Sequence, residues 1–118
     1  MGDLSNNFSR SEFECSCGCG FDDVDIRLVH VLQEMRTELG CPVTITSGCR
    51  CKEYNAEVGG ASKSQHLLGT AADIVVSGCT PKYIQEYLTD KYEGQFGIGS
   101  YKQFTHIDVR GGCARWIG

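Results

Sequence analysis

The sequence predicts an α+β fold in which a small, largely antiparallel sheet packs with one long helix and one or two shorter helices. One stretch repeats its apolar residues at helical spacing, which indicates the long helix. Several short runs are rich in β-branched residues, as strands are. Two of the expected strands are joined by a tight turn, which favours antiparallel pairing.

The first element expected is an irregular arm, because residues 1–21 are polar and rich in glycine and cysteine. The long helix follows from Asp23 to Leu39, with Asp22 or Asp23 as its N-cap and Gly40 at its C-terminal end. Its apolar positions fall on one face and are Val24, Leu28, Val31, Leu32, Met35 and Leu39.

Three shorter elements are expected next. Residues 42–47 form a short run of β-branched residues and predict a strand. A short helix is expected at about 51–58, before the break that Gly59 and Gly60 introduce. Residues 71–76 are almost continuously apolar, so we expect a buried strand.

The C-terminal third is expected to contain a helix and two strands. Thr80 and Pro81 form an N-cap followed by proline at the first helical position, which predicts a helix start. Strands are expected near 97–101 and 104–109. The length of 118 residues fits one domain, which we expect to span residues 1–118.

Composition and charge exclude several classes of protein. Eleven Lys and Arg against fifteen Asp and Glu give a net charge of −4, which argues against nucleic-acid binding. No apolar run approaches the roughly 18 residues of a membrane span, so we expect no membrane interaction. The N-terminus lacks the pattern of a signal peptide, so we expect a cytoplasmic protein as synthesised. We also expect the protein to be a monomer.

Eight cysteines are many for a chain of this size. Cys15, Cys17 and Cys19 alternate with single residues, which departs from the ligand spacing of typical zinc fingers. Cys49 and Cys51 form a second short pair that can in principle join the first. We interpret the cysteines as mainly buried small apolar residues, with one or two disulfides, in preference to a second metal site.

The three histidines are the better candidates for chemistry. His30 lies within the long helix, and we interpret it as an ordinary helix residue. His66 precedes Gly69, which permits a turn, so His66 and Asp73 can converge although they lie seven positions apart.

His106 lies in an expected strand, two residues before Asp108. Side chains repeat every two residues along a strand, so these two share a face and are expected to line a cleft. Ile107 and Val109 point the other way and suit a core. Two histidines and one carboxylate are typical ligands of a catalytic zinc ion. From these residues alone, an unrelated set of surface histidines and aspartates stays an open alternative.

The chain also contains an ordered series of motifs, which are Phe8-Ser-x-x-Glu12-Phe13, Thr46-Ser-Gly-Cys-Arg50, Asn55-Ala-x-Val-Gly-Gly60, Ser64-x-His66-x-x-Gly69-x-Ala71-x-Asp73, His106-x-Asp108 and Arg115-Trp116. With this series the sequence resembles the zinc D-alanyl-D-alanine carboxypeptidase family of cell-wall peptidases, and its small single-domain branch most closely. That family includes phage L-alanyl-D-glutamate peptidases and shares its fold with the hedgehog signalling domain. The resemblance extends over essentially the whole chain.

The resemblance implies a role for each matching residue. His66, Asp73 and His106 correspond to the zinc ligands of the family. Arg50 matches an arginine that the family places against the substrate carbonyl or its developing oxyanion, where a fixed guanidinium stabilises charge. A structural salt bridge is the alternative role for Arg50.

One position departs from the family pattern. Many members have a catalytic carboxylate three residues before the last zinc histidine, where this chain has Gln103. Glutamine cannot accept a proton as a general base. Asp108 is the nearest replacement, and its competing role is to accept the other ring N–H of a ligand histidine. Both roles stay open here.

The resemblance therefore implies a zinc metallopeptidase that hydrolyses a peptide bond in peptidoglycan stem peptides, of the D,D-carboxypeptidase or endopeptidase type. One alternative is a non-catalytic binding module that zinc stabilises. Another is a phage structural or tail-associated protein. The missing signal pattern favours an enzyme encoded by a phage or prophage that reaches the cell wall after release.

Overall fold

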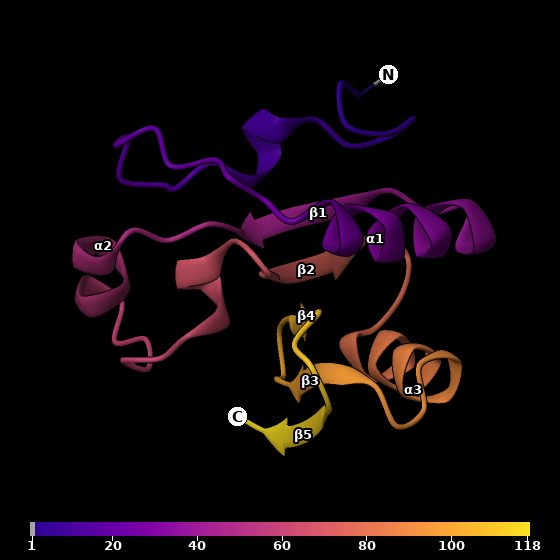
Figure 1. Cartoon of the computed structure of the whole chain (residues 1–118). Helices are drawn as coiled ribbons and strands as arrows, with labels where there is room; N and C mark the ends of the chain where they lie inside the picture. The colour runs from indigo at the N-terminus through magenta and orange to yellow at the C-terminus, as the bar shows by residue number, and fades with distance from the viewer. Residues whose placement is uncertain (1) are drawn as a thin grey trace.

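In the computed structural model, which describes residues 2–118, helices pack around a five-stranded sheet (Figure 1). The elements in chain order are the 3₁₀ helix η1 (Arg10–Phe13), α1 (Ile26–Leu39), β1 (Val43–Ser47), α2 (Lys52–Glu57), the 3₁₀ helix η2 (Gln65–Leu68), β2 (Ala71–Val76), α3 (Pro81–Lys91), β3 (Phe96–Ser100), β4 (Thr105–Asp108) and β5 (Cys113–Ile117). Within the described part of the chain, no helix has both the length and the apolar character needed to cross a membrane.

The strands follow the order β1-β2-β4-β3-β5 across the sheet. All neighbouring pairs are antiparallel except β3 and β5, which run parallel. The predicted class, a small and largely antiparallel sheet with one long helix and shorter helices, is confirmed. The sequence missed β5 because this edge strand buries none of its residues and so lacks the apolar pattern of a core strand.

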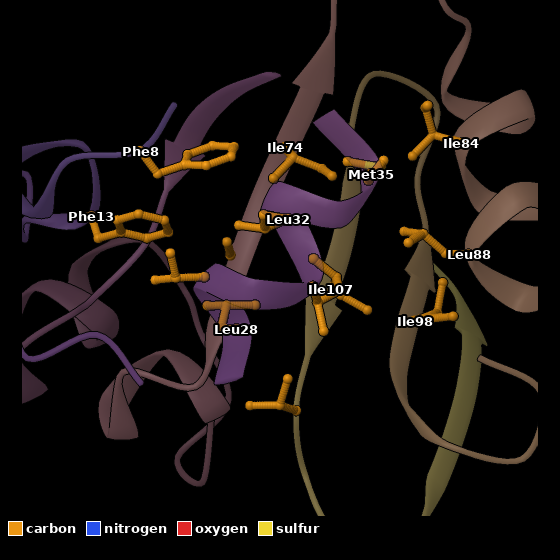
Figure 2. Packing of buried hydrophobic residues seen from close by; sticks show 14 of the residues in the cluster. Phe8, Phe13, Leu28, Leu32, Met35, Ile74, Ile84, Leu88, Ile98 and Ile107 are labelled. Atoms are coloured by element: carbon orange, nitrogen blue, oxygen red, sulfur yellow. The ribbon is translucent and has the colours of Figure 1, made fainter. Parts of the chain in front are cut away.

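The two longer helices bury their apolar side chains against the same face of the sheet. Ala72, Ile107 and Ile98 are cross-strand partners on β2, β4 and β3, and all belong to the core. Figure 2 shows the side chains of α1 over β2 and β4, with those of α3 beside β3. The nearly or fully buried residues that it labels are Phe8, Phe13, Leu28, Leu32, Met35, Ile74, Ile84, Leu88, Ile98 and Ile107.

The long helix begins later than the sequence predicts. Its N-cap is Asp25, whose carboxylate accepts a hydrogen bond from the backbone N–H two residues on, so Asp22 and Asp23 are wrong as caps. The reason is tertiary: the N–H of Asp25 donates to the carbonyl oxygen of Gly69 at 2.8 Å, which keeps the preceding residues extended. The predicted end is confirmed, because Gly40 adopts a left-handed conformation with φ of 67°.

The N-terminal segment differs from the irregular arm expected for residues 1–21. Arg10–Phe13 form η1, and the side chains of Phe8 and Phe13 are 1% and 0% exposed. The carbonyl oxygen of Phe13 accepts a hydrogen bond from the N–H of Cys49 at 2.8 Å. This segment, indigo at the top of Figure 1, therefore contributes to the core and supports the loop that follows β1.

Candidate metal centre

A row of side chains crosses the sheet on the face opposite α1 and α3. The register places Asp73 of β2 opposite His106 of β4, then Gly99 of β3, then Trp116 of β5. Successive residues of a strand point to opposite faces, so the same strands send Ile107 and its partners into the core. Strand pairing thus brings Asp73 and His106 together from positions distant in the sequence.

His66 reaches the same place from η2. The hydroxyl of Ser64 accepts a hydrogen bond from the N–H of His66 at 3.2 Å and so starts this short helix. Gly69 ends it with φ of 73°, and a side chain there would overlap the carbonyl oxygen of Asp23. The predicted turn at Gly69 is confirmed, and with it the approach of His66 to Asp73.

The three side chains meet at one point. Oδ1 of Asp73 lies 3.1 Å from Nδ1 of His106 and 3.3 Å from Nε2 of His66. All three residues are buried. A tetrahedral zinc ion with ligand bonds of about 2.0–2.1 Å separates its nitrogen and oxygen ligands by about 3.3 Å. The spacing therefore fits one ion of this size.

The outer nitrogen of each ring is held by an acceptor. Nδ1 of His66 lies 2.7 Å from the carbonyl oxygen of Gly48, and Nε2 of His106 lies 2.7 Å from Oδ2 of Asp108. A carbonyl and a carboxylate only accept, so the outer nitrogens must donate. In the neutral rings, the inner nitrogens then direct lone pairs at Asp73. Three acceptors converge without a donor, and this arrangement requires a cation or an added proton.

The same demand for positive charge affects the pKa values. Burial raises the pKa of Asp73, but its close contacts with the imidazoles of His106 and His66 outweigh burial and lower it to about 2. Burial lowers the pKa of His106, but its bonds to Asp108 and Asp73 outweigh burial and raise it. The lowered pKa of Asp73 and the raised pKa of His106 both reflect the attraction between a carboxylate and an imidazolium at this point.

Asp108 lies behind His106 and outside the cleft. Its side chain is fully buried, and the Nε and Nη2 groups of Arg110 each donate to it at 2.8 Å. Burial raises the pKa of Asp108, but Arg110 and His106 outweigh burial and hold it well below its usual range. A Cβ on Gly97 would overlap this carboxylate and lie 2.6 Å from Nε of Arg110, so the pair requires glycine there.

Arg50 is fixed by three acceptors at the other side of the site. Its guanidinium donates to Oγ of Ser47 at 3.0 Å, to Oδ1 of Asn55 at 3.3 Å and to Oδ2 of Asp73 at 3.2 Å. A Cβ on Gly60 would lie 3.0 Å from Nη1 of Arg50 and overlap Asn55. Arg50 therefore occupies one oxygen of Asp73 and leaves the other for the histidines.

The site opens into a cleft of about 530 Å³. One wall is aromatic: Nε1 of Trp116 donates to Oη of Tyr101 at 3.0 Å, and Tyr101 stacks on Phe104 with 4.4 Å between ring centroids. The ring of His106 lies 5.0 Å from that of Trp116, centroid to centroid. Gly99 permits this wall, because a Cβ there would lie 2.6 Å from Nε1 of Trp116.

The structure places most of the predicted site residues in this cleft. Arg50 and the three candidate ligands line it. The expectation that Asp108 faces the cleft is wrong: it shares a strand face with His106, but Arg110 packs over its carboxylate. Gln103 is exposed and His30 is exposed on α1.

Sequence reasoning missed Arg110 and the carbonyl of Gly48. Arg110 follows Asp108 at the two-residue spacing of a strand, and this spacing was a usable signal. A backbone carbonyl carries no signal in the sequence, because every residue has one.

The sequence is similar to known peptidases. A family model described as peptidase M15 matches residues 6–108. Over 44 residues the chain is 48% identical to the zinc D-Ala-D-Ala carboxypeptidase of Streptomyces albus G. That alignment covers 36% of this chain and only 17% of the relative, so it compares one part of the two proteins. The match over residues 6–108 shows that the chain belongs to the peptidase M15 family.

Proposed function

We propose that this protein is a zinc metallopeptidase that hydrolyses a peptide bond in the stem peptides of bacterial peptidoglycan. The observation that carries the proposal is the convergence of two imidazole lone pairs and one carboxylate oxygen in a cleft. Membership of the peptidase M15 family supports it.

His66, Asp73 and His106 are the residues that would hold the ion. Three protein ligands are the number at a catalytic zinc site, which keeps a fourth position for water or substrate. Zinc bound there would polarise a peptide carbonyl and lower the pKa of a bound water toward about 7.

Arg50 is proposed to stabilise the negative charge that develops on the carbonyl oxygen. Its side chain lines the cleft and is only 14% exposed. Three acceptors hold the guanidinium, so little reorganisation accompanies the reaction. We expect Arg50→Lys to lower kcat by about 10²–10³-fold, the usual cost of removing a donor to an oxyanion, while the bound zinc is retained.

Asp108 is proposed to position His106. Its carboxylate bonds to Nε2, whereas the ligand atom Nδ1 lies on the other side of the ring. The acceptor fixes the tautomer that presents the Nδ1 lone pair. Its carboxylate has no exposed surface, so it cannot take a proton directly from a water molecule in the cleft.

The charges of the cleft favour an anionic peptide. Arg50, Lys63 and Arg110 line it, and among the described lining residues the one carboxylate is Asp73. The chain as a whole has a net charge of −4, so this cationic surface is local. Stem peptides with free carboxylates complement this cationic surface. This complementarity fits both proposed types of enzyme, a D,D-carboxypeptidase and an endopeptidase.

The test is incubation of the pure protein with defined peptidoglycan fragments, followed by mass analysis of the products. We expect cleavage that a chelator abolishes and zinc restores, and the product masses identify the bond. His66→Ala should abolish cleavage and zinc binding at this site, whereas His30→Ala, which removes the exposed histidine of α1, should retain both. Zinc binding without cleavage over a broad panel of fragments would support a non-catalytic module instead.

A further inference from the structure

Four of the eight cysteines form a cluster where the N-terminal segment meets the start of α2, and they are Cys15, Cys17, Cys19 and Cys51. Sγ of Cys17 lies 3.5 Å from Sγ of Cys15 and 3.6 Å from Sγ of Cys51. The four Sγ atoms, including that of Cys19, all lie within 4.8 Å of one another. The sequence interpretation of mainly buried apolar cysteines with one or two disulfides is wrong for this cluster, because Cys17 and Cys19 are exposed and its thiols are free, whereas Cys15 and Cys49 are buried as expected.

The local backbone explains how alternating cysteines gather. The N–H of Gly18 donates to the carbonyl oxygen of Cys15 at 3.2 Å and closes a turn. Gly18 and Gly20 adopt φ of 84° and 91°, conformations that glycine favours. This loop brings its three thiols to one side, toward Cys51.

The sulfur spacing distinguishes a metal site from disulfides. A disulfide places its sulfur atoms about 2.0 Å apart. Four thiolates around a tetrahedral zinc ion, each about 2.3 Å from the metal, are separated by about 3.8 Å. The contacts of 3.5 and 3.6 Å are close to the second value and far from the first. All eight cysteines, which lie among the described residues, carry free thiols.

Backbone donors also point at the sulfur atoms. The N–H of Cys51 donates to Sγ of Cys15 at 3.4 Å, and the N–H of Tyr54 donates to Sγ of Cys51 at 3.4 Å. Such N–H groups stabilise the negative charge that thiolates retain when they bind a metal. The second of these bonds also makes Cys51 the N-cap of α2.

We propose that Cys15, Cys17, Cys19 and Cys51 bind a structural zinc ion, separate from the site of His66. Four protein ligands complete tetrahedral coordination and leave no position for a substrate. Each thiol releases its proton to solvent as it binds, so the ion is taken up more tightly as the pH rises. Soft thiolates in a tetrahedral set favour zinc over magnesium or calcium.

The proposed zinc ion would join the N-terminal segment to the start of α2, next to Arg50. Arg50 lies between Cys49, whose N–H bonds to Phe13, and Cys51, a proposed ligand. Cross-linking residues 15–19 to Cys51 restricts the backbone that carries Arg50. The site therefore has a role in folding that does not depend on the proposed peptidase activity.

The experiment measures metal content and ligand type. Protein purified without chelator or reductant should contain about two zinc equivalents per chain, and the double variant Cys17→Ser/Cys19→Ser about one. His66→Ala should also contain about one, so the two sites are counted separately. Cys113→Ser, which removes an exposed cysteine of β5 outside the cluster, is the matched control and should retain both.

Cobalt substitution supplies the second readout. Wild-type protein and the His66→Ala variant should show the near-ultraviolet absorption of thiolate-to-cobalt charge transfer, and the double cysteine variant should lose it. The proposal is overturned if the double variant retains the metal content of the wild type, or if iron replaces zinc in the purified protein. It is also overturned if alkylation of the unreduced, denatured protein in chelator shows a disulfide among the four cysteines.

Discussion

Replacement of Asp108 by asparagine tests how the site controls its histidine ligand. The carboxylate accepts from Nε2 of His106 at 2.7 Å and from Arg110 at 2.8 Å, so both of its oxygens are acceptors. An asparagine has one oxygen and one NH₂ group. If its oxygen faces Arg110, the NH₂ group faces Nε2, and the ring must then carry its proton on Nδ1. That proton occupies the lone pair which a metal needs.

The magnitude follows from this loss of the correct tautomer. Removal of an outer partner of a metal-binding histidine typically costs 10–100-fold in metal affinity, which is about 1.4–2.8 kcal/mol. Asp108→Asn also leaves Arg110 without its ion pair. Breaking a buried pair costs about 3–5 kcal/mol of folding free energy, and the lower end applies because the side chain of Arg110 is 32% exposed.

The assay is zinc competition with a chromogenic chelator at fixed pH, combined with urea unfolding of the metal-free protein. Asp90→Asn, at an exposed position on α3, is the matched control and should leave both quantities unchanged. A variant that keeps wild-type zinc affinity but loses kcat would refute the positioning role of Asp108.

Three further predictions concern packing and pH. Gly97→Ala should destabilise the protein by about 1–3 kcal/mol in urea unfolding and weaken zinc binding, because its Cβ would overlap the carboxylate of Asp108. The control Gly111→Ala places its Cβ in open space and should change neither quantity. Phe13→Ala should cost about 3–5 kcal/mol in urea unfolding, whereas Ile117→Ala, at 89% exposure, should stay within about 0.5 kcal/mol; equal costs would contradict burial of the N-terminal segment. In the metal-free protein, burial lowers the pKa of His106, but its aspartate partners outweigh burial and raise this pKa above the unfolded value. The contribution of His106 to folding stability is therefore complete below about pH 6.5 and is lost as the pH rises through the folded pKa. The thermal midpoint of the metal-free wild type, measured relative to that of His106→Gln, should therefore fall as the pH rises above about 6.5. A difference that grows with pH would contradict this.

The helix and strand periods were sufficient to predict most of the fold. The residues of β2 were predicted at their observed bounds, and Thr80 was identified correctly as the N-cap of α3. These signals are local, because a cap or an apolar run acts within a few residues. The start of α1 was missed because a contact with Gly69, distant in the sequence, decides where that helix begins.

For the candidate site, the sequence contained the residue types and their strand spacing. The two-residue period placed His106 and Asp108 on one face, and the motif series indicated the family. The sequence could not show whether the side chain of Asp108 lies in the cleft or behind the ring of His106. Arg110, Gly97 and the packing of β3 against β4 determine that Asp108 lies behind the ring.

The sequence by itself thus determined the fold class, the candidate zinc ligands and the position of Arg50 in its motif. The tertiary structure alone decided which nitrogen of each histidine faces Asp73, because the carbonyl of Gly48 and the carboxylate of Asp108 set the tautomers. It also decided that Cys51 joins the three cysteines of the N-terminal segment, whereas Cys49 lies in the core. Both outcomes depend on contacts between residues distant in the chain, and spacing along the sequence does not specify such contacts.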